Sequence, residues 1–136
     1  MKRLFVILLS SGLLFIYSAE NLAVDKAVRP HPSGVPERGY AVASWYGKPF
    51  HGRYMASGVR FNMHNPHIVA HKTLPLGTPV RITNPENGRS IFVWVMDRGP
   101  YVKGRAFDLS HAAAKKLGIV GLGVARIHFE ITSPRG

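Results

Sequence analysis

Apolar and polar residues alternate along much of the second half of the chain, which is the pattern of β-strands with one buried face. Residues 80–84 (VRITN) and 90–97 (SIFVWVMD) flank the sequence PENG, in which Asn87 and Gly88 tolerate the positive φ angles of a tight turn. We therefore expect a β-hairpin over these two segments.

The last alternating segment, residues 124–131, places apolar side chains on one face and Arg, His and Glu on the other, which predicts a half-buried strand. One segment is helical in character instead. In residues 110–118 (SHAAAKKLG), Ser110 suits the N-cap and Gly118 suits the terminator. Short strands separated by frequent glycine and proline, with little helix, predict an all-β fold, a small closed barrel.

Residues 91–97 are apolar on both faces, so we expect this strand to be buried on both sides. Asp97 ends the strand. We expect it to emerge at the barrel mouth against apolar neighbours, where partial desolvation favours the protonated form and suits a general acid. The alternative is a structural carboxylate that caps the following RGPY turn or pairs with Arg98.

The N-terminus has a different pattern. Two basic residues followed by an apolar run over residues 4–17 indicate a signal peptide over residues 1–19 and export to the periplasm or cell envelope. Tyr17 is larger than the residues preferred near a cleavage site, so an uncleaved membrane anchor is the alternative.

The rest of the 136-residue chain has room for one domain. Residues 20–38 are rich in proline and glycine and are expected to be a linker, which leaves residues 39–132 as the folded unit. The sequence contains no cysteine, so its core must hold the fold without disulfides.

Charge narrows the class of partner. Eighteen Lys and Arg against seven Asp and Glu give a formal net charge of +11, which predicts attraction to a polyanion. For an exported protein the accessible polyanions are cell-wall glycan bearing carboxylates, anionic wall polymers and lipid head groups. A nucleic-acid-binding barrel is the less favoured alternative, because the leader argues against a cytoplasmic location.

Four carboxylates lie in the folded unit, so any acid/base chemistry must use them. Glu86 in the hairpin turn and Glu130 on the polar face of the last strand are interpreted as solvated surface groups. Asp108 stands close to Arg105 and to the helix start. Its structural interpretation is a cap that pairs with Arg105, and glycan contact or catalysis is the alternative.

Three histidines in the sequence HNPHIVAH raise the question of a metal site. Strand spacing would put His67 and His71 about 13 Å apart, too far to share one zinc. His71 precedes the turn KTLPLGT, where a neutral imidazole would be able to orient Asp97 or buffer its proton. An ordinary hydrogen-bonded histidine is the alternative.

Four blocks of sequence together carry a family resemblance: ASWYG, ASGVRFNM, AHKTLPLGTPVRITNPENGRSIFVWVMDRGPY and GRAFDLSHAAAKKLG. Over about residues 39–131 the chain resembles the rare lipoprotein A (RlpA) family of septal lytic transglycosylases. The resemblance implies a six-stranded double-psi β-barrel with one or two short helices, related to the expansin and barwin barrels.

The resemblance also implies an enzyme. It would be a lyase that cleaves the glycan backbone of peptidoglycan between MurNAc and GlcNAc without water, preferring strands that lack stem peptides. The saccharide's own C6 hydroxyl attacks C1 and leaves a 1,6-anhydromuramic end, which requires an acid and a base. We expect a monomer that needs no metal or cofactor, binds peptidoglycan glycan strands and no nucleic acid, and touches the membrane only through a retained leader.

Position by position, the resemblance assigns catalysis to Asp97 and His71. The expected substrate-binding residues are acidic, basic and aromatic side chains of the same motifs: Asp108, Arg98, Arg105, Trp45, Tyr46 and Tyr101.

One position departs from the family pattern. The family usually reads ASGE or ANGE, with a catalytic glutamate where this chain has Val59, and valine cannot transfer a proton. Either Asp97 serves as acid first and base second, with activity lowered because one such group is worth about 10²- to 10⁴-fold, or the domain is a non-catalytic, expansin-like module that binds and loosens cell-wall glycan.

Overall fold

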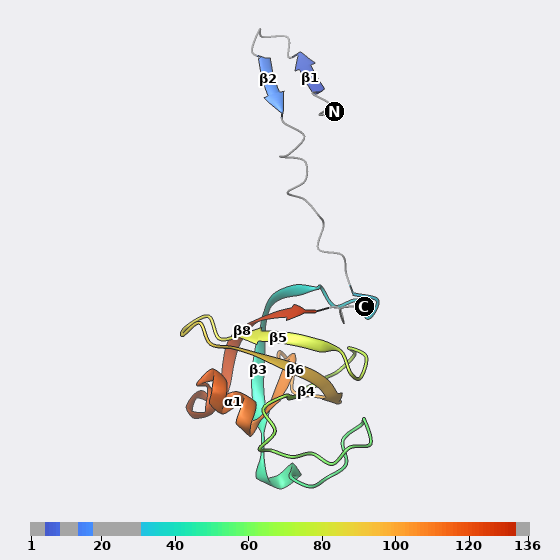
Figure 1. The fold of residues 1–136 in the computed structure, drawn as a ribbon, viewed down its shortest axis with the longest axis vertical. Helices are drawn as coiled ribbons and strands as arrows, with labels where there is room; N and C mark the ends of the chain where they lie inside the picture. The colour runs from blue at the N-terminus through green and yellow to red at the C-terminus, as the bar shows by residue number, and fades with distance from the viewer. Residues whose placement is uncertain (1–4, 9–13, 18–30, 133–136) are drawn as a thin grey trace.

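The computed structural model describes residues 5–8, 14–17 and 31–132, and the last range contains the strands of a closed barrel (Figure 1). The barrel strands are β3 (Arg38–Tyr46), β4 (Ile68–His71), β5 (Pro79–Thr83), β6 (Ser90–Asp97), β7 (Phe107–Ser110) and β8 (Val124–Ile131). The short helices are α1 (His111–Leu117) and the 3₁₀ turns η2 (Lys48–Phe50) and η3 (Val120–Leu122). The prediction of a mainly β, six-stranded barrel is confirmed.

Neighbouring strands follow the order β3-β7-β4-β6-β5-β8, and β8 pairs with β3 to close the barrel. The pairs β3/β7 and β4/β6 are parallel, and the other pairs are antiparallel. Parallel neighbours cannot be joined by a tight turn, so the chain crosses between strands that are distant in sequence. As a result, four strands from different parts of the chain contribute to one region of the barrel.

The hairpin of β5 and β6 is confirmed, with Thr83 opposite Ser90. Its loop is longer than a two-residue turn, because the N–H of Asn84 donates to the carbonyl of Arg89 at 2.9 Å. Within this loop, residues 84–89, only Gly88 has a positive φ, 73°. The expectation that Asn87 shares in a tight turn is therefore not met.

The predicted helix and last strand are also confirmed. The Ser110 hydroxyl accepts a hydrogen bond from the N–H of Ala113, and Gly118 ends α1 with a φ of 74°. β8 has the predicted bounds, and two apolar side chains of its predicted face, Ile127 and Phe129, are buried.

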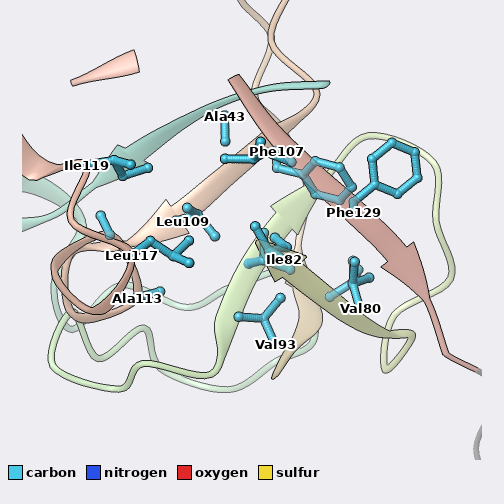
Figure 2. Close-up of a cluster of buried hydrophobic side chains, with 14 of the residues drawn as sticks. Ala43, Val80, Ile82, Val93, Phe107, Leu109, Ala113, Leu117, Ile119 and Phe129 are labelled. Carbon is cyan, nitrogen blue, oxygen red and sulfur yellow. The ribbon is translucent and has the colours of Figure 1, made fainter. Parts of the chain in front are cut away.

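The barrel interior contains side chains that are fully buried or nearly so, among them Val80, Ile82, Val93, Phe107, Leu109 and Phe129 (Figure 2). Helix α1 adds Ala113 and Leu117 to the same cluster. Full burial of a Leu, Ile, Val or Phe side chain stabilises a fold by about 1.5–3 kcal/mol relative to leaving it exposed. This core is what fixes the strands that carry the candidate site.

The expectation that β6 is buried on both faces is wrong. Val93 and Val95 are completely buried, but on the opposite face Phe92 is 52% exposed and Trp94 is 42% exposed. The reason is the barrel itself, because each strand of a closed sheet has one face inside and one face outside. Asp97 nevertheless follows Val93 and Val95 in phase, as expected.

Near the N-terminus, Phe5–Leu8 and Leu14–Tyr17 form β1 and β2, which pair antiparallel. These strands fall within the segment expected to be a signal peptide. The rest of that segment, with residues 20–30 of the expected linker, lies outside the described residues. In the part of the chain that the structure describes, no helix is long and apolar enough to cross a membrane.

The second half of the expected linker contacts the barrel. The N–H of His31 donates to the carbonyl of Val35 at 2.8 Å, and Val35 packs against the core. The carbonyl of Glu37 accepts from the N–H of Ile131 at 2.7 Å, just before β3 begins.

Candidate active site

A cavity of about 600 Å³ lies between the end of β3, the end of β6 and the loops that follow these two strands. Ala70 of β4 and Asp108 of β7 complete its lining. The cavity brings together all but one of the residues expected at the site: Trp45, Tyr46, Asp97, Arg98, Tyr101, Arg105 and Asp108. The exception is His71, which does not line it.

Strand register explains why the two aspartates meet. Ala70 is paired with Asp97 of β6 on one side and with Asp108 of β7 on the other, and Asp108 is paired with Ser44 of β3. Residues in register on neighbouring strands share a face, and strands lie about 4.8 Å apart, so the Cα atoms of the aspartates are about 10 Å apart. The small side chain of Ala70 leaves the space between the two carboxylates open.

Asp97 is held by backbone groups. Its Oδ1 accepts hydrogen bonds from the N–H of Ala56 at 2.9 Å and from the N–H of Arg98 at 2.8 Å. Of the two structural alternatives, the side-chain pair with Arg98 is not formed, because the Arg98 guanidinium donates to backbone carbonyls, whereas the bond from the Arg98 N–H does place the carboxylate at the start of the RGPY turn. These two bonds fix the carboxylate at the cavity wall.

Asp108 is held differently. Burial raises the pKa of its carboxyl group, although the hydrogen bond from Ser44 and the charge of Arg105 act in the opposite direction and Asp97 adds to the increase. The Ser44 hydroxyl donates to Asp108 Oδ1 at 3.1 Å. The interpretation of Asp108 as a helix cap is wrong, because Ser110 caps α1.

Tyr46 lies beside both carboxylates. Burial, and then the negative charges of Asp97 and Asp108, raise the pKa of its phenol. The hydroxyl is close enough to Asp97 to interact, yet it is buried and has no partner of good hydrogen-bond geometry among the described residues. The hydroxyl therefore approaches Asp97 without a well-formed hydrogen bond, and the phenol stays neutral.

His71 is connected to Asp97 indirectly. Its Nδ1 accepts from the N–H groups of Thr73 and Leu74, both at 3.1 Å, which closes the turn after β4. The carbonyls of His71 and Leu74 in turn accept from Arg98 Nη1 at 3.1 and 2.6 Å. Burial, followed by the charges of Arg98 and Lys72, lowers the pKa of His71 to about 4. The neutral imidazole thus supports the turn that orients Arg98.

The remaining aromatic and basic residues are placed on the wall and rim. Trp45 donates from Nε1 to the carbonyl of Val120 at 3.2 Å and packs against His111, with ring centroids 5.0 Å apart. Tyr101 is 79% exposed at the rim. Arg105 is near enough to Asp108 to act on its charge.

The other expected features lie away from this cavity. Val59 is 52% exposed and lines a different hollow. His64 packs against His51, and His67 against Trp94, so the three histidines of HNPHIVAH have separate surroundings. In the described ranges, no group of three or more His, Cys, Asp or Glu is placed to hold a metal ion.

Sequence reasoning missed two residues of this site, Ser44 and Ala70. Ser44 stands in the ASWYG block and Ala70 directly before His71, but neither carries a local signal of its role. Their importance depends on the register between strands that are distant in sequence, and this register cannot be predicted from residue spacing along the chain.

Comparison with known proteins adds a family. Residues 39–129 match the model of a family described as lytic transglycolase. The chain is 59% identical over 87 residues to a probable endolytic peptidoglycan transglycosylase RlpA of Aquifex aeolicus, a match that covers 64% of this chain and 37% of that protein. It is 40% identical to the endolytic peptidoglycan transglycosylase RlpA of Neisseria meningitidis serogroup B, over 98% of this chain and 62% of that one. The chain therefore spans less than two thirds of these relatives.

Solved structures agree on the fold. A Streptomyces papain inhibitor superposes with a TM-score of 0.59 at 27% identity, covering 75% of this chain and 98% of that one. An expansin of Clavibacter michiganensis superposes with a TM-score of 0.55 at 22% identity, covering 73% and 52%. These likenesses support the double-psi barrel and carry no statement about activity.

Proposed function

Since the chain belongs to the lytic transglycolase family that includes RlpA, we propose that it is an exported endolytic peptidoglycan transglycosylase that works in the cavity around Asp97. Its substrate would be the glycan backbone, in strands that lack stem peptides. The relatives are named for this activity, and the observation that carries the proposal is that two aspartates face one cavity over Ala70.

The reaction needs one proton donor and one proton acceptor. The C6 hydroxyl oxygen bonds to C1 while the bond from C1 to the glycosidic oxygen breaks. A proton passes from the acid to the leaving oxygen, and the hydroxyl proton passes to the base. No water is consumed, and the product carries a 1,6-anhydro ring.

Two carboxyl groups in one cavity are able to share these tasks. Asp108, whose pKa is raised by burial, is suited to hold the proton for the leaving oxygen. Asp97, fixed by two backbone N–H groups, is suited to accept the hydroxyl proton. This pairing would replace the glutamate that the resemblance places at position 59. His71 would act as a positioning residue through Arg98.

The basic loop after β6 would draw in an anionic glycan, because Arg98 and Arg105 line the cavity and the chain carries a net charge of +11. Trp45 and Tyr101 offer flat faces on which sugar rings stack. Location in the periplasm or cell envelope, and a monomeric state, belong to this proposal.

The test is product analysis on purified glycan strands without stem peptides. The protein should release fragments with 1,6-anhydromuramic ends, and Asp97→Asn should lower their rate of formation by about 10²- to 10⁴-fold. Asparagine keeps an oxygen for the N–H groups of Ala56 and Arg98, so circular dichroism should show an unchanged fold. No anhydro product at any protein concentration would overturn the proposal.

A second candidate is a non-catalytic module that binds and loosens cell-wall glycan. This function is favoured by Val59, because its side chain has no ionisable group to transfer a proton and it lines a hollow separate from the aspartate cavity. This alternative predicts co-sedimentation with sacculi without soluble products. The variant Val59→Glu separates the two functions: cleavage that appears only in the variant would identify the natural protein as a binder.

A further inference from the structure

We propose that the outer face of β6, formed by Phe92 and Trp94, is a second glycan-binding surface, which we call the outer aromatic face. It would hold the same anionic glycan strand beyond the cavity, so it rests on the proposed function. Phe92 is 52% exposed and Trp94 is 42% exposed, and both alternate with buried valines along one strand. Exposed apolar side chains that lie next to one another on a surface mark a contact site more often than single ones do.

The two rings lie in a row suited to a chain of sugars. Side chains two residues apart on one face of a strand are about 7 Å apart. Trp94 is also fixed in place, because its ring packs edge-on against His67 with centroids 5.6 Å apart. His67 Nδ1 donates to the carbonyl of Phe92 at 2.8 Å, which ties this neighbour to the same strand. A rigid aromatic ring loses little entropy when a sugar stacks on it.

Open hollows lie on either side of His67. One, of about 500 Å³, is lined by Trp94, Val59 and Arg60 among others. The other, of about 550 Å³, is lined by Phe92, Arg89 and Lys116 among others. Within the described residues no carboxylate lines either hollow.

Charge therefore selects an anionic partner. Arg81 stands between Phe92 of β6 and Glu130 of β8 in register, so its charge is balanced by a neighbouring carboxylate, and the cations next to the rings are Arg60, Arg89 and Lys116 of the two hollows. A ligand with flat apolar faces and regularly spaced carboxylates fits this combination, and that is the chemistry of a glycan strand bearing lactyl groups.

One loop, residues 55–59, lies between the outer aromatic face and the aspartate cavity. Asp97 ends the strand that carries both rings, and Ala56 donates to Asp97 while its neighbour Ser57 donates from its N–H to the carbonyl of Met96 at 3.1 Å. Met55 and Val59 of the same loop line the first hollow. A strand bound at Asp97 would pass over this loop and reach Trp94.

The experiment measures binding and cleavage separately. The full chain and the double variant Phe92→Thr/Trp94→Thr are titrated with long glycan strands and with tetrasaccharides, both without stem peptides. Threonine keeps the strand propensity of these exposed positions. Loss of two stacked rings should weaken binding of long strands about tenfold and leave the tetrasaccharide unchanged. For cleavage, KM for long strands should rise while kcat stays the same.

The matched control is Tyr40→Thr. Tyr40 is 58% exposed on β3, which is not a neighbour of β6, so this change should leave the affinity unchanged. Equal affinity of the double variant and the wild type for long strands would overturn the proposal. So would a wild-type dimer, seen in sedimentation velocity, that the double variant loses, because a second copy would then cover the face.

The two proposals fail in different ways. If no anhydro product forms but the double variant binds long strands less tightly, the outer aromatic face stands and the transglycosylase activity is overturned. If cleavage is normal and affinity does not depend on Phe92 and Trp94, the transglycosylase activity stands and the outer aromatic face is overturned. Thermal unfolding of the double variant near the wild-type temperature shows that neither result comes from misfolding.

Discussion

The two aspartates of the cavity show how one residue's surroundings decide its chemistry. Asp97 is fixed by backbone N–H groups at the end of a strand, whereas Asp108 is half-buried and accepts a hydrogen bond from Ser44. The pKa of Asp108 is raised in the folded state, so the folded protein binds this proton more tightly than the unfolded chain does. Its contribution to stability is therefore greatest at low pH and is lost as the pH rises through the folded pKa.

The raised pKa of Asp108 leads to a prediction for the stability of Asp108→Asn. Asparagine is neutral and keeps an oxygen for the Ser44 hydroxyl, so the variant should be at least as stable as the wild type at pH 7. The difference should shrink at pH 3. Cleavage should fall by about 10²- to 10⁴-fold if Asp108 is the acid. Thermal unfolding at both pH values, with product analysis, checks this. A variant less stable at pH 7 would mean that the attraction of Arg105 outweighs burial.

Part of the site was predictable from single residues. Asp97 and Asp108 stood out because carboxylates are scarce in this sequence, and His71 because it precedes a turn; the family resemblance then assigned roles to His71 and Tyr46. Their geometry was not predictable. The methyl side chain of Ala70 separates the aspartates only because three strands align there, and the link from His71 to Asp97 runs through backbone carbonyls that carry no sequence signal.

At the scale of elements, the prediction succeeded where the signal is local. Helix α1 has its cap, its terminator and its small residues within one short segment, and β8 has clean alternation. The prediction for β6 failed on its outer face. An apolar pattern in the sequence does not show whether that face is covered by other side chains or exposed to solvent. The parallel pairs β3/β7 and β4/β6 join distant segments, so no local pattern in the sequence predicts them.

Replacing Ser110 measures how much its hydrogen bonds between α1 and the barrel contribute to stability. Its hydroxyl accepts from the N–H of Ala113 at 3.1 Å and donates to the carbonyl of Asn65 at 2.6 Å, and the side chain is fully buried. Ser110→Ala removes both bonds, so it should lower the free energy of unfolding by about 2 kcal/mol.

Urea denaturation measures this change, and Ser57→Ala is the control. The Ser57 hydroxyl accepts a long, exposed hydrogen bond of 3.4 Å from the N–H of Val59, so the loss of this hydroxyl should cost about 0.5 kcal/mol or less. Equal effects of the two variants would show that the cap contributes no more than an ordinary surface hydroxyl.

For the whole molecule, burial of a neutral histidine makes stability depend on pH. The pKa of His71 is lowered from 6.5 to about 4, chiefly by burial, so the unfolded chain binds more protons than the folded protein between these values. Stability is complete above pH 6.5 and declines as the pH falls toward 4. The loss from this residue is at most about 3 kcal/mol. A charged His71 would also lose the acceptor that closes the turn holding Arg98.

The measurement is the urea midpoint of unfolding from pH 7 to pH 4. In His71→Asn, the amide oxygen can accept from the same turn and does not titrate, so its midpoint should fall less steeply than that of the wild type between pH 6.5 and 4. His64→Asn changes an exposed histidine and should keep the wild-type slope. Parallel slopes for the wild type and His71→Asn would show that the imidazole is not held neutral by the fold, and the indirect link from His71 to Asp97 would then lose its physical basis.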